Sequence, residues 1–247
     1  LLNSQGLDVN YQKSIFYLSI TGTLVRGTDM LFVGDGESSS NPLSNAKEIA
    51  NRVNHKLDLA MATAPAPTGE LPVIFSPDGV ATTLLQPLLS GFNGKNVIDG
   101  SSPLVGRLGS QIFDDRLSMF DDGTTPWRAG SRPWDDEGVM TRRIPLIEHG
   151  IAKSFLFDLR TASHACTHTT ASAARPLGGL PSPSPSVLLI DKGTMSLDDM
   201  ISDVKKGIYI NEFWYCRVLD PITQVVTGLN RNGSFLVENG KITKPVG

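Results

Sequence analysis

Apolar residues recur along the chain with two spacings, one typical of strands and one typical of helices. The segment 14–25 (SIFYLSITGTLV) is rich in aromatic and β-branched residues, which predicts a strand. In the segment 43–57, apolar residues three or four positions apart predict a helix with one buried face. These residues are Leu43, Ala46, Ala50, Val53 and Leu57. Between the two elements, residues 34–42 (GDGESSSNP) have the composition of a loop.

Two further helices are predicted from their start signals. A short buried strand at 72–77 (PVIFSP) contains Ser76, which can cap a helix that runs through DGVATTLLQPLLSGF. Pro87 is expected to bend this helix or to end it early, because proline has no N–H and its ring clashes with the preceding turn. A capping box at Ser196 predicts another helix, which Gly207 is expected to end.

The remaining signals are antiparallel. In 142–158, two apolar segments flank Glu148, His149 and Gly150, and Asn239-Gly240 is the favoured pair for a type I′ hairpin turn. The strands do not alternate regularly with helices, as they would in a parallel α/β fold. We therefore expect an α+β fold with a largely antiparallel or mixed β-sheet and a few packed helices.

Composition excludes several functional classes. Hydrophobic residues make up 40% and charged residues 19% of 247 positions, as in water-soluble globular proteins, and every apolar run is too short to span a membrane. The net charge is −3, and the basic pairs at 142–143 and 205–206 form no stripe for a phosphate backbone, so nucleic-acid binding is not expected. Cys166 and Cys216 do not form a disulfide framework, and reduced thiols predict a cytoplasmic protein.

Common catalytic motifs are absent from the sequence. It contains no Gly-x-Ser-x-Gly elbow, no phosphate-binding loop and no Gly-x-Gly-x-x-Gly that follows a strand. A zincin helix needs a glutamate directly after its first histidine. No histidine of this chain has one; the histidines are His55, His149, His164 and His168.

One cluster could hold a soft metal ion. On an extended strand, His164, Cys166 and His168 would point to the same side and could form a tripod. However, the flanking residues have the composition of a loop, and structural zinc sites usually separate their ligands by two or more residues. A solvated loop is the favoured interpretation, and a metal site is the alternative.

The adjacent carboxylates Asp135, Asp136 and Glu137 also allow two interpretations. A hard cation could bind them, but a strand would direct at most two of the three to one face. In a structural turn, the aspartates would accept backbone N–H bonds and Gly138 would supply an unusual backbone angle. An arginine of the pair at 142–143 would offset the charge. The structural turn is the favoured interpretation.

The block around these carboxylates, GSRPWDDEGVMTRRIPLIEHGIAKSFLFDLRTA (130–162), resembles the signature of the TldD/PmbA family, once called modulators of DNA gyrase. Similar blocks follow the family's order along most of the chain: NSQG, PVIFSPDGVATTLLQPLLSGFNG, GSSPLVGRLGSQIF, GIYINEF and FLVENGKITKPV. The resemblance implies that residues 1–247 form a single domain of the family's C-terminal type, without its N-terminal domain and final segment. The stretch 161–186 departs from the family, so no role can be transferred there.

The resemblance implies a zinc metallopeptidase built from two kinds of subunit, which matures antibiotic peptides and degrades an antitoxin. A TldD-like subunit carries a His-Glu-x-x-x-His helix, and its PmbA-like (TldE) partner lacks that motif. In the best register, the histidines fall on Leu85 and Ser90 and the glutamate on Gln86. Leu85 has no ligand atom, Gln86 is not a base, and Pro87 disturbs the helix between them.

The resemblance therefore implies a PmbA/TldE-like subunit that pairs with a TldD-like catalytic subunit and helps to enclose the peptide substrate. No catalytic residue and no bound cofactor are expected in this chain, and the zinc would belong to the partner. Self-association as a homodimer in the partner's absence stays open. The alternative is a metal-dependent peptidase that uses His164, Cys166 and His168 or ligands outside this sequence. A gyrase-binding regulator has no support in these residues.

Overall fold

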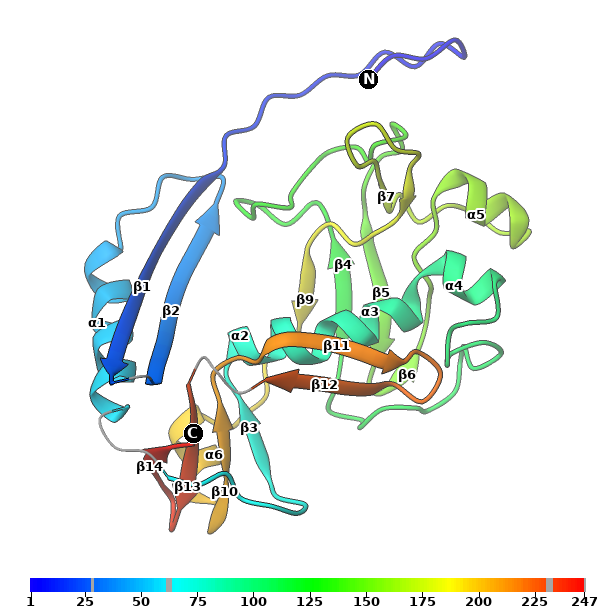
Figure 1. Ribbon diagram of the computed structural model, residues 1–247. Helices are drawn as coiled ribbons and strands as arrows, with labels where there is room; N and C mark the ends of the chain where they lie inside the picture. Colours follow the sequence, from blue (N-terminus) through cyan, green and yellow to red (C-terminus); the bar gives the residue numbers. More distant parts are fainter. Residues whose placement is uncertain (28, 61–63, 230–232, 247) are drawn as a thin grey trace.

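The strands form several small sheets, which are nearly all antiparallel (Figure 1). The computed structural model describes residues 1–27, 29–60, 64–229 and 233–246. Within this part of the chain, β3 (Val73–Phe75) and β10 (Lys206–Ile210) form the one parallel pair of strands. The predicted α+β fold with mixed and antiparallel sheets is confirmed.

A long hairpin and a helix form one side of the molecule, at the left of Figure 1. β1 (Phe16–Arg26) pairs along its whole length with β2 (Asp29–Ser39), and α1 (Ala46–Leu59) packs against both strands. The helix buries Ile49 and Val53 completely or almost completely. The prediction of a loop at 34–42 was wrong for residues 34–39. These residues form part of β2 and pair with β1 despite their polar composition.

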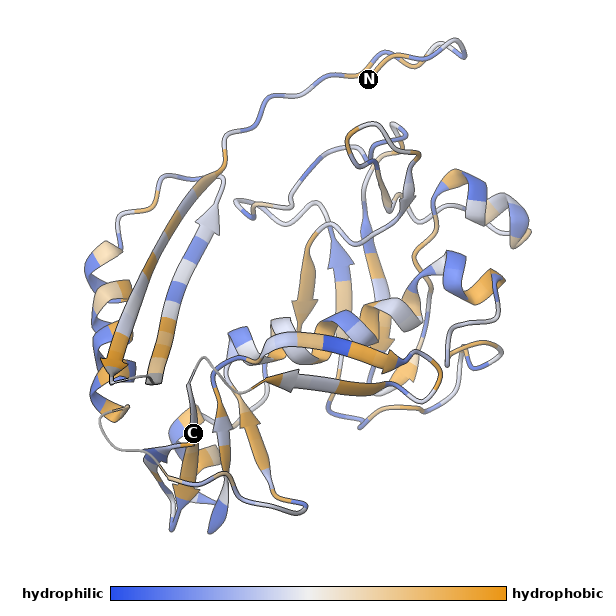
Figure 2. Cartoon of the chain, viewed as in Figure 1, coloured by the Kyte–Doolittle hydropathy of each residue, from blue (hydrophilic) through white to orange (hydrophobic). Residues whose placement is uncertain are grey.

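A second sheet contains the C-terminal strands. Its order is β14 (Lys241–Pro245), β13 (Ser234–Glu238), β10 and β3, and α6 (Leu197–Ser202) packs nearby. In Figure 2 the short strand β3 is orange, because all three of its residues are apolar.

Local signals in this sheet were predicted with mixed success. Asn239 and Gly240 have φ values of 50° and 76°, so both residues of the predicted type I′ turn are left-handed. The capping box at Ser196 is present, but α6 ends at Ser202 and Gly207 lies in β10. A Cβ atom at Gly207 would lie 2.6 Å from the carbonyl oxygen of Pro72, so this glycine permits close strand packing rather than ending the helix.

A third sheet contains the predicted hairpin. Its order is β6 (Ile151–Ala152), β5 (Arg143–Glu148), β4 (Met119–Asp122) and β9 (Leu188–Ile190). Two short strands, β7 (Ala173–Ala174) and β8 (Ser182–Pro183), pair beside it, and α5 (Leu159–His164) follows β6. The turn between β5 and β6 falls at His149 and Gly150, as predicted.

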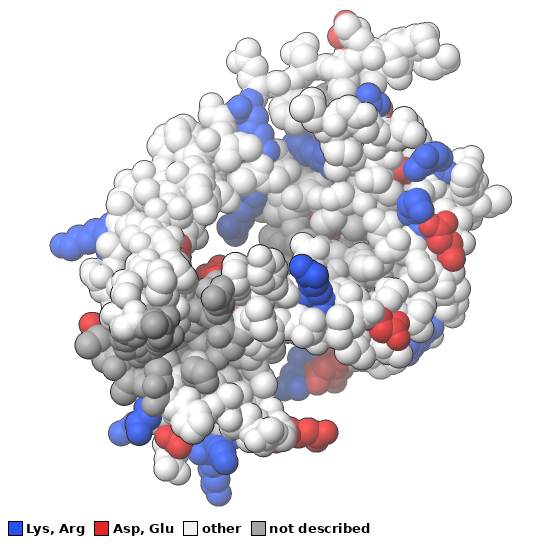
Figure 3. Space-filling model, in the orientation of Figure 1, with Lys and Arg blue, Asp and Glu red and all other residues white. Residues whose placement is uncertain are grey.

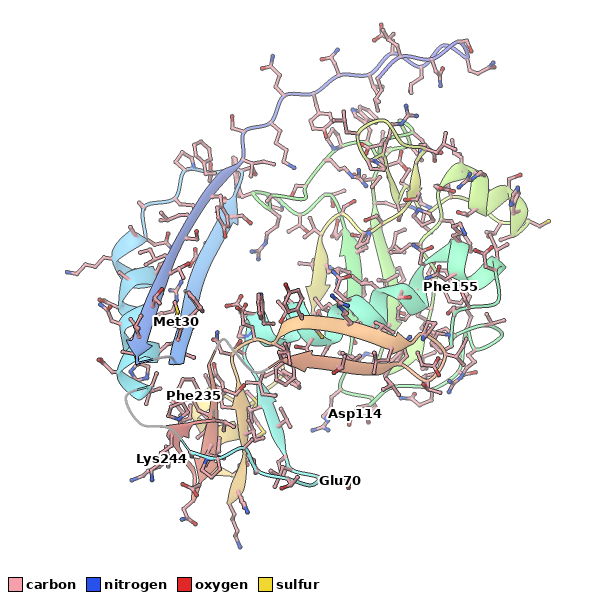
Figure 4. All side chains as sticks on the ribbon, in the orientation of Figure 1. Met30, Glu70, Asp114, Phe155, Phe235 and Lys244 are labelled. Atoms are coloured by element: carbon pink, nitrogen blue, oxygen red, sulfur yellow. The ribbon has the colours of Figure 1, made fainter. Side chains whose placement is uncertain are left out.

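The main apolar core lies between this third sheet and the central helices. Phe92 is completely buried, and its ring centroid is 6.4 Å from that of Phe155, which Figure 4 labels. Phe155 also contacts Phe157 edge to face at 6.2 Å. These rings join Leu146 and Ile147 of β5 in one buried cluster.

The central helix is continuous but changes its type. It consists of α2 (Pro77–Gly79), a π-helical segment η1 (Val80–Leu85) and α3 (Gln86–Phe92). Ser76 caps it, because its hydroxyl oxygen accepts a 3.0 Å hydrogen bond from the Gly79 N–H. Pro87 does not end the helix early. The wider π turn instead comes directly before α3, where Pro87 offers no N–H to the preceding turn.

A short helix and an isolated hairpin complete the fold. α4 (Gly94–Ile98) follows α3, and β11 (Trp214–Asp220) pairs with β12 (Val225–Leu229) across the middle of Figure 1. Figure 3 shows this face of the molecule hollowed between the side that carries β1 and β2 and the side that carries β4. Within the described residues, no helix combines the length and the apolar composition needed to cross a bilayer.

Candidate functional site

The acidic turn that the sequence singled out is built around a fully buried carboxylate. Asp135 has no exposed surface. Its Oδ1 accepts hydrogen bonds from the backbone N–H groups of Glu137 at 3.0 Å and Val139 at 2.9 Å. Its Oδ2 accepts from the N–H of Ala173 in β7 at 3.1 Å. A buried charge needs such donors, and here the backbone supplies all three.

The next two carboxylates connect the turn to other segments. Asp136 Oδ2 accepts from the Arg175 N–H at 2.7 Å, and its Oδ1 lies 3.4 Å from the guanidinium of Arg132. Glu137 Oε2 accepts a 2.7 Å bond from the N–H of Leu159, the first residue of α5. Burial raises the pKa of Glu137 above its usual 4.5, although the Leu159 N–H favours the ionised form. The turn thus holds β7 and the start of α5 in place.

Gly138 brings the N-terminal segment onto the turn. Its φ is 81°, which disfavours residues with a side chain. A Cβ atom at this position would lie 2.3 Å from a Leu7 methyl carbon, so the glycine also leaves room for that leucine. The same four residues therefore order segments that are far apart in the sequence.

The prediction that an arginine of the pair at 142–143 offsets the charge of the turn was wrong. Arg142 donates a 2.6 Å hydrogen bond to the carbonyl oxygen of Thr169, and the Arg143 guanidinium lies 3.8 Å above the ring centre of Phe120. Among the described residues, the arginine ion-paired with the turn is Arg132, which precedes it.

This geometry favours a structural role for the turn over a cation site. The carboxylates of Asp135, Asp136 and Glu137 accept backbone bonds from different segments rather than converging on one point. Across the described ranges, no group of three His, Cys, Asp or Glu side chains is arranged to hold a metal ion. The structural role stays a prediction, which the relative stabilities of Asp135→Asn and Asp136→Asn variants would test.

The geometry on which the soft-metal alternative depended is absent. His164 is the last residue of α5, and Cys166 has a φ of 52°, so residues 164–168 are not an extended strand. His164, Cys166 and His168 are all exposed. They do not share one side of a strand, as the tripod required.

The positions that the resemblance assigned to a metal-binding motif lie beside a cavity of about 380 Å³. Gln86 and Ser90 of α3 line this cavity, whereas Leu85 packs against the main apolar core. Ser90 is held from the next helix, because Asn96 Nδ2 donates to the Ser90 carbonyl at 2.9 Å and lies 3.2 Å from its hydroxyl oxygen.

The opposite wall of this cavity was not predicted. It is formed by residues 183–185, and Asn93 connects the two walls by donating a 2.9 Å bond to the Pro183 carbonyl. The side-chain Oδ1 of Asn93 accepts a 2.9 Å hydrogen bond from the Lys95 N–H, so the asparagine also caps α4. An asparagine before Gly-Lys after a helix was a usable cap signal, but its contact with 183–185 is not visible in the sequence.

The polar side chains that line this cavity are all neutral, and leucines and prolines complete the lining. The amides of Gln86, Asn93 and Asn96 and the hydroxyl of Ser90 can donate to and accept from an amide. None of them can take up a proton near neutral pH. Zinc requires imidazole, thiolate or carboxylate ligands, so these residues do not fit a zinc ion.

Comparisons with known proteins agree with this fold. The sequence profile of the PmbA/TldA metallopeptidase C-terminal domain matches residues 68–247. The uncharacterized protein MJ0231 of Methanocaldococcus jannaschii is 30% identical over 98% of this chain and 56% of its own length. A metalloprotease TldD homolog of Haemophilus influenzae is 32% identical over 75% of this chain and 38% of its own length.

A solved structure is also similar over almost the whole chain. The crystal structure of TldE from Thermococcus kodakarensis has a TM-score of 0.89 and 26% sequence identity, and the match covers 99% of this chain and 56% of that one. The chain thus spans about half the length of these relatives, or less. By the profile match and the shared fold, the chain belongs to the TldD/PmbA family of metallopeptidases.

Proposed function

We propose that this chain is a PmbA/TldE-like subunit of a TldD/PmbA-type metallopeptidase complex and that it does not itself hydrolyse peptides. One observation carries the proposal. At the motif positions, Gln86 and Ser90 line the cavity beside α3 and Leu85 packs into the core, so none offers a zinc ligand or a general base. The fold similarity to TldE supports the assignment.

In this proposal the cavity beside α3 binds the peptide without cleaving it. Gln86 is exposed on α3, and Ser90 and Asn93 lie on the same side of the cavity. Neutral amides and hydroxyls match the N–H and C=O groups of an extended peptide and make little demand on its side chains. The chain would thus help to position a peptide that a TldD-like partner cleaves.

In this proposal the partner subunit would bind the zinc ion. The ion would polarise the scissile carbonyl and the attacking water there. The contribution of the present chain is to bind and orient the peptide and to limit its contact with water. We also propose that residues 1–247 act as one domain of the family's C-terminal type. A cytoplasmic location fits the thiols of Cys166 and Cys216, both of which are free.

Metal content and peptide cleavage test the proposal together. The purified chain is incubated with zinc, dialysed, and analysed by mass spectrometry for bound metal. It is then mixed with an unstructured peptide, with and without a chelator. We expect no stoichiometric zinc and no cleavage from the chain alone.

The Haemophilus influenzae TldD homolog is the matched control and the test partner. We expect that relative to bind zinc and to cleave the peptide only when it is mixed with a PmbA/TldE-like subunit, which this chain should replace at least in part. Stoichiometric zinc in the present chain, together with chelator-sensitive cleavage by it alone, would show that the chain is an enzyme in its own right.

A further inference from the structure

A larger cavity lies away from α3, between the N-terminal segment and the loops that follow β4. Its volume is about 660 Å³, within the range of about 300–1,000 Å³ typical of ligand pockets. Its walls come from residues 11–14, 123–127, 131–134 and 140–141 and from Ser40. Five separate segments therefore build it, and neither the acidic turn nor the cavity beside α3 contributes to its lining.

Large apolar side chains dominate the lining of this cavity. Trp127 and Met140 are 61% and 65% exposed, and Tyr11 is 46% exposed. Trp134 forms part of the same wall. Exposed aromatic and thioether surface in a concave site is favourable for an apolar ligand, because binding removes that surface from water.

The backbone of Trp127 is held in an unusual conformation. Its φ is 63°, in the left-handed region that bulky residues rarely occupy. Its carbonyl oxygen accepts hydrogen bonds from the Ser40 N–H at 3.1 Å and the Ser39 hydroxyl at 3.0 Å. Strain that is fixed in this way recurs at ligand sites, and here it presents an exposed indole at the cavity.

The cavity also carries positive charge without a matching acid. Lys13 Nζ donates to the carbonyl oxygens of Ala129 and Ser131, which uses two of the three N–H donors of the ammonium group. Arg132 is already ion-paired with Asp136 at 3.4 Å. Among the described residues that line the cavity none is acidic. Burial and the nearby Arg132 lower the pKa of Lys13.

We propose that this cavity binds a carboxylate carried on an aromatic or long aliphatic group. The apolar part would contact Trp127, Trp134 and Met140, and the carboxylate would take the third N–H of Lys13. Two sources have this chemistry: the C-terminus of a peptide that ends in a large apolar residue, and a small free acid. The inference does not depend on the proposed subunit role, since the site lies entirely within this chain.

Tryptophan fluorescence provides a direct assay. The chain contains three tryptophans, of which Trp127 and Trp134 line the cavity. A Trp214→Phe variant therefore leaves the two indoles of the cavity as the only tryptophan fluorophores, which are excited selectively at wavelengths where tyrosine does not absorb. This variant is titrated with Gly-Gly-Phe, with the same tripeptide as its C-terminal amide, and with 3-phenylpropionate.

We expect a saturable fluorescence change with both acids and an affinity for Gly-Gly-Phe about tenfold or more above that for its amide. In the same background, Lys13→Met should remove this preference, and Lys13→Arg should restore most of it. Lys153→Met is the matched control, because Lys153 pairs with Glu148 and does not line the cavity. Tighter binding of the tripeptide than of 3-phenylpropionate would identify a peptide terminus as the natural ligand class, and the reverse order a small acid.

Three results would overturn the proposal. They are the absence of a saturable signal, equal affinities for acid and amide, and a Lys13→Met variant that behaves like Lys153→Met. Circular dichroism of each variant shows whether it is folded. If Lys13→Met is unfolded, the comparison of acid with amide and the Lys13→Arg variant decide the outcome.

Discussion

Replacing Asp135 by asparagine is predicted to destabilise the folded chain much more than the same change at its neighbour Asp136. The carboxylate of Asp135 is completely buried and accepts three backbone N–H bonds. The side chain of Asp136 is 37% exposed, and its carboxylate accepts one backbone N–H bond and lies near Arg132. The comparison changes the same atoms in both variants and isolates the effect of burial.

The magnitude follows from the hydrogen bonds of Asp135. An asparagine can keep its oxygen toward Glu137 and Val139, but its NH₂ group then faces the N–H of Ala173, which is also a donor. Losing one bond to a charged acceptor costs about 1.5–3 kcal/mol, and leaving a buried N–H unpaired costs about 1 kcal/mol more. We therefore expect Asp135→Asn to lower the free energy of unfolding by about 2.5–4 kcal/mol.

Urea unfolding followed by circular dichroism measures this quantity for the wild type and both variants. A domain of this size loses about 2–4 °C of Tm per kcal/mol, so Asp135→Asn should lower the Tm by about 5–16 °C. Asp136→Asn should cost about 1 kcal/mol, because exposed ion pairs contribute little. Similar losses in both variants, or a stable Asp135→Asn protein, would refute the reasoning. A divalent cation that stabilises the wild type but not Asp135→Asn would show that the turn is a cation site.

Three further predictions concern backbone space and pH. Gly138→Ala should destabilise more than Gly106→Ala, since both have positive φ but only Gly138 lacks room for a Cβ atom; the midpoint of urea unfolding measures the difference. Gly94→Ala should cost about 1–3 kcal/mol by overpacking, because its Cβ atom would lie 2.3 Å from the Phe157 ring; thermal unfolding checks this. Burial raises the pKa of Glu137, so the folded state binds more protons above pH 4.5 and loses stability as the pH rises through that range. Glu137→Gln should remove this contribution to the pH dependence of the free energy of unfolding, which is measured from pH 4 to pH 7.

The elements that the sequence predicted well depend on local chemistry. The Ser76 cap and the Asn239-Gly240 turn are set by side chain and backbone bonds within a few residues. Residues 34–39 were misassigned because their strand conformation depends on pairing with β1, which composition does not reveal. Gly207 was ambiguous for a related reason, since a glycine can end a helix or allow close packing in a strand.

The features of the candidate sites were also predictable only where they depend on local residue types. That Asp135 accepts backbone N–H bonds follows from the residue types of the turn. Which arginine pairs with Asp136 depends on the path of the chain, and Arg132 rather than the later pair lies close enough. The cavity lined by Trp127 could not be predicted, because segments distant in sequence build it and nothing in the sequence marks a left-handed tryptophan.

In the proposed function, the cavity beside α3 has the framework of a peptide site but lacks the groups needed for catalysis. Its framework consists of the Ser76 cap, the buried face of the helix and the bonds of Asn93 and Asn96, and none of these contacts needs a metal ion. Reactivity would require ligands at the positions of Leu85 and Ser90, where the chain has an apolar side chain and a hydroxyl. Because the framework and the ligands are independent, a chain of this family can keep the surface that orients a peptide and lose the groups that cleave it. This independence supports the proposed role, in which the subunit would bind peptides and depend on a catalytic partner.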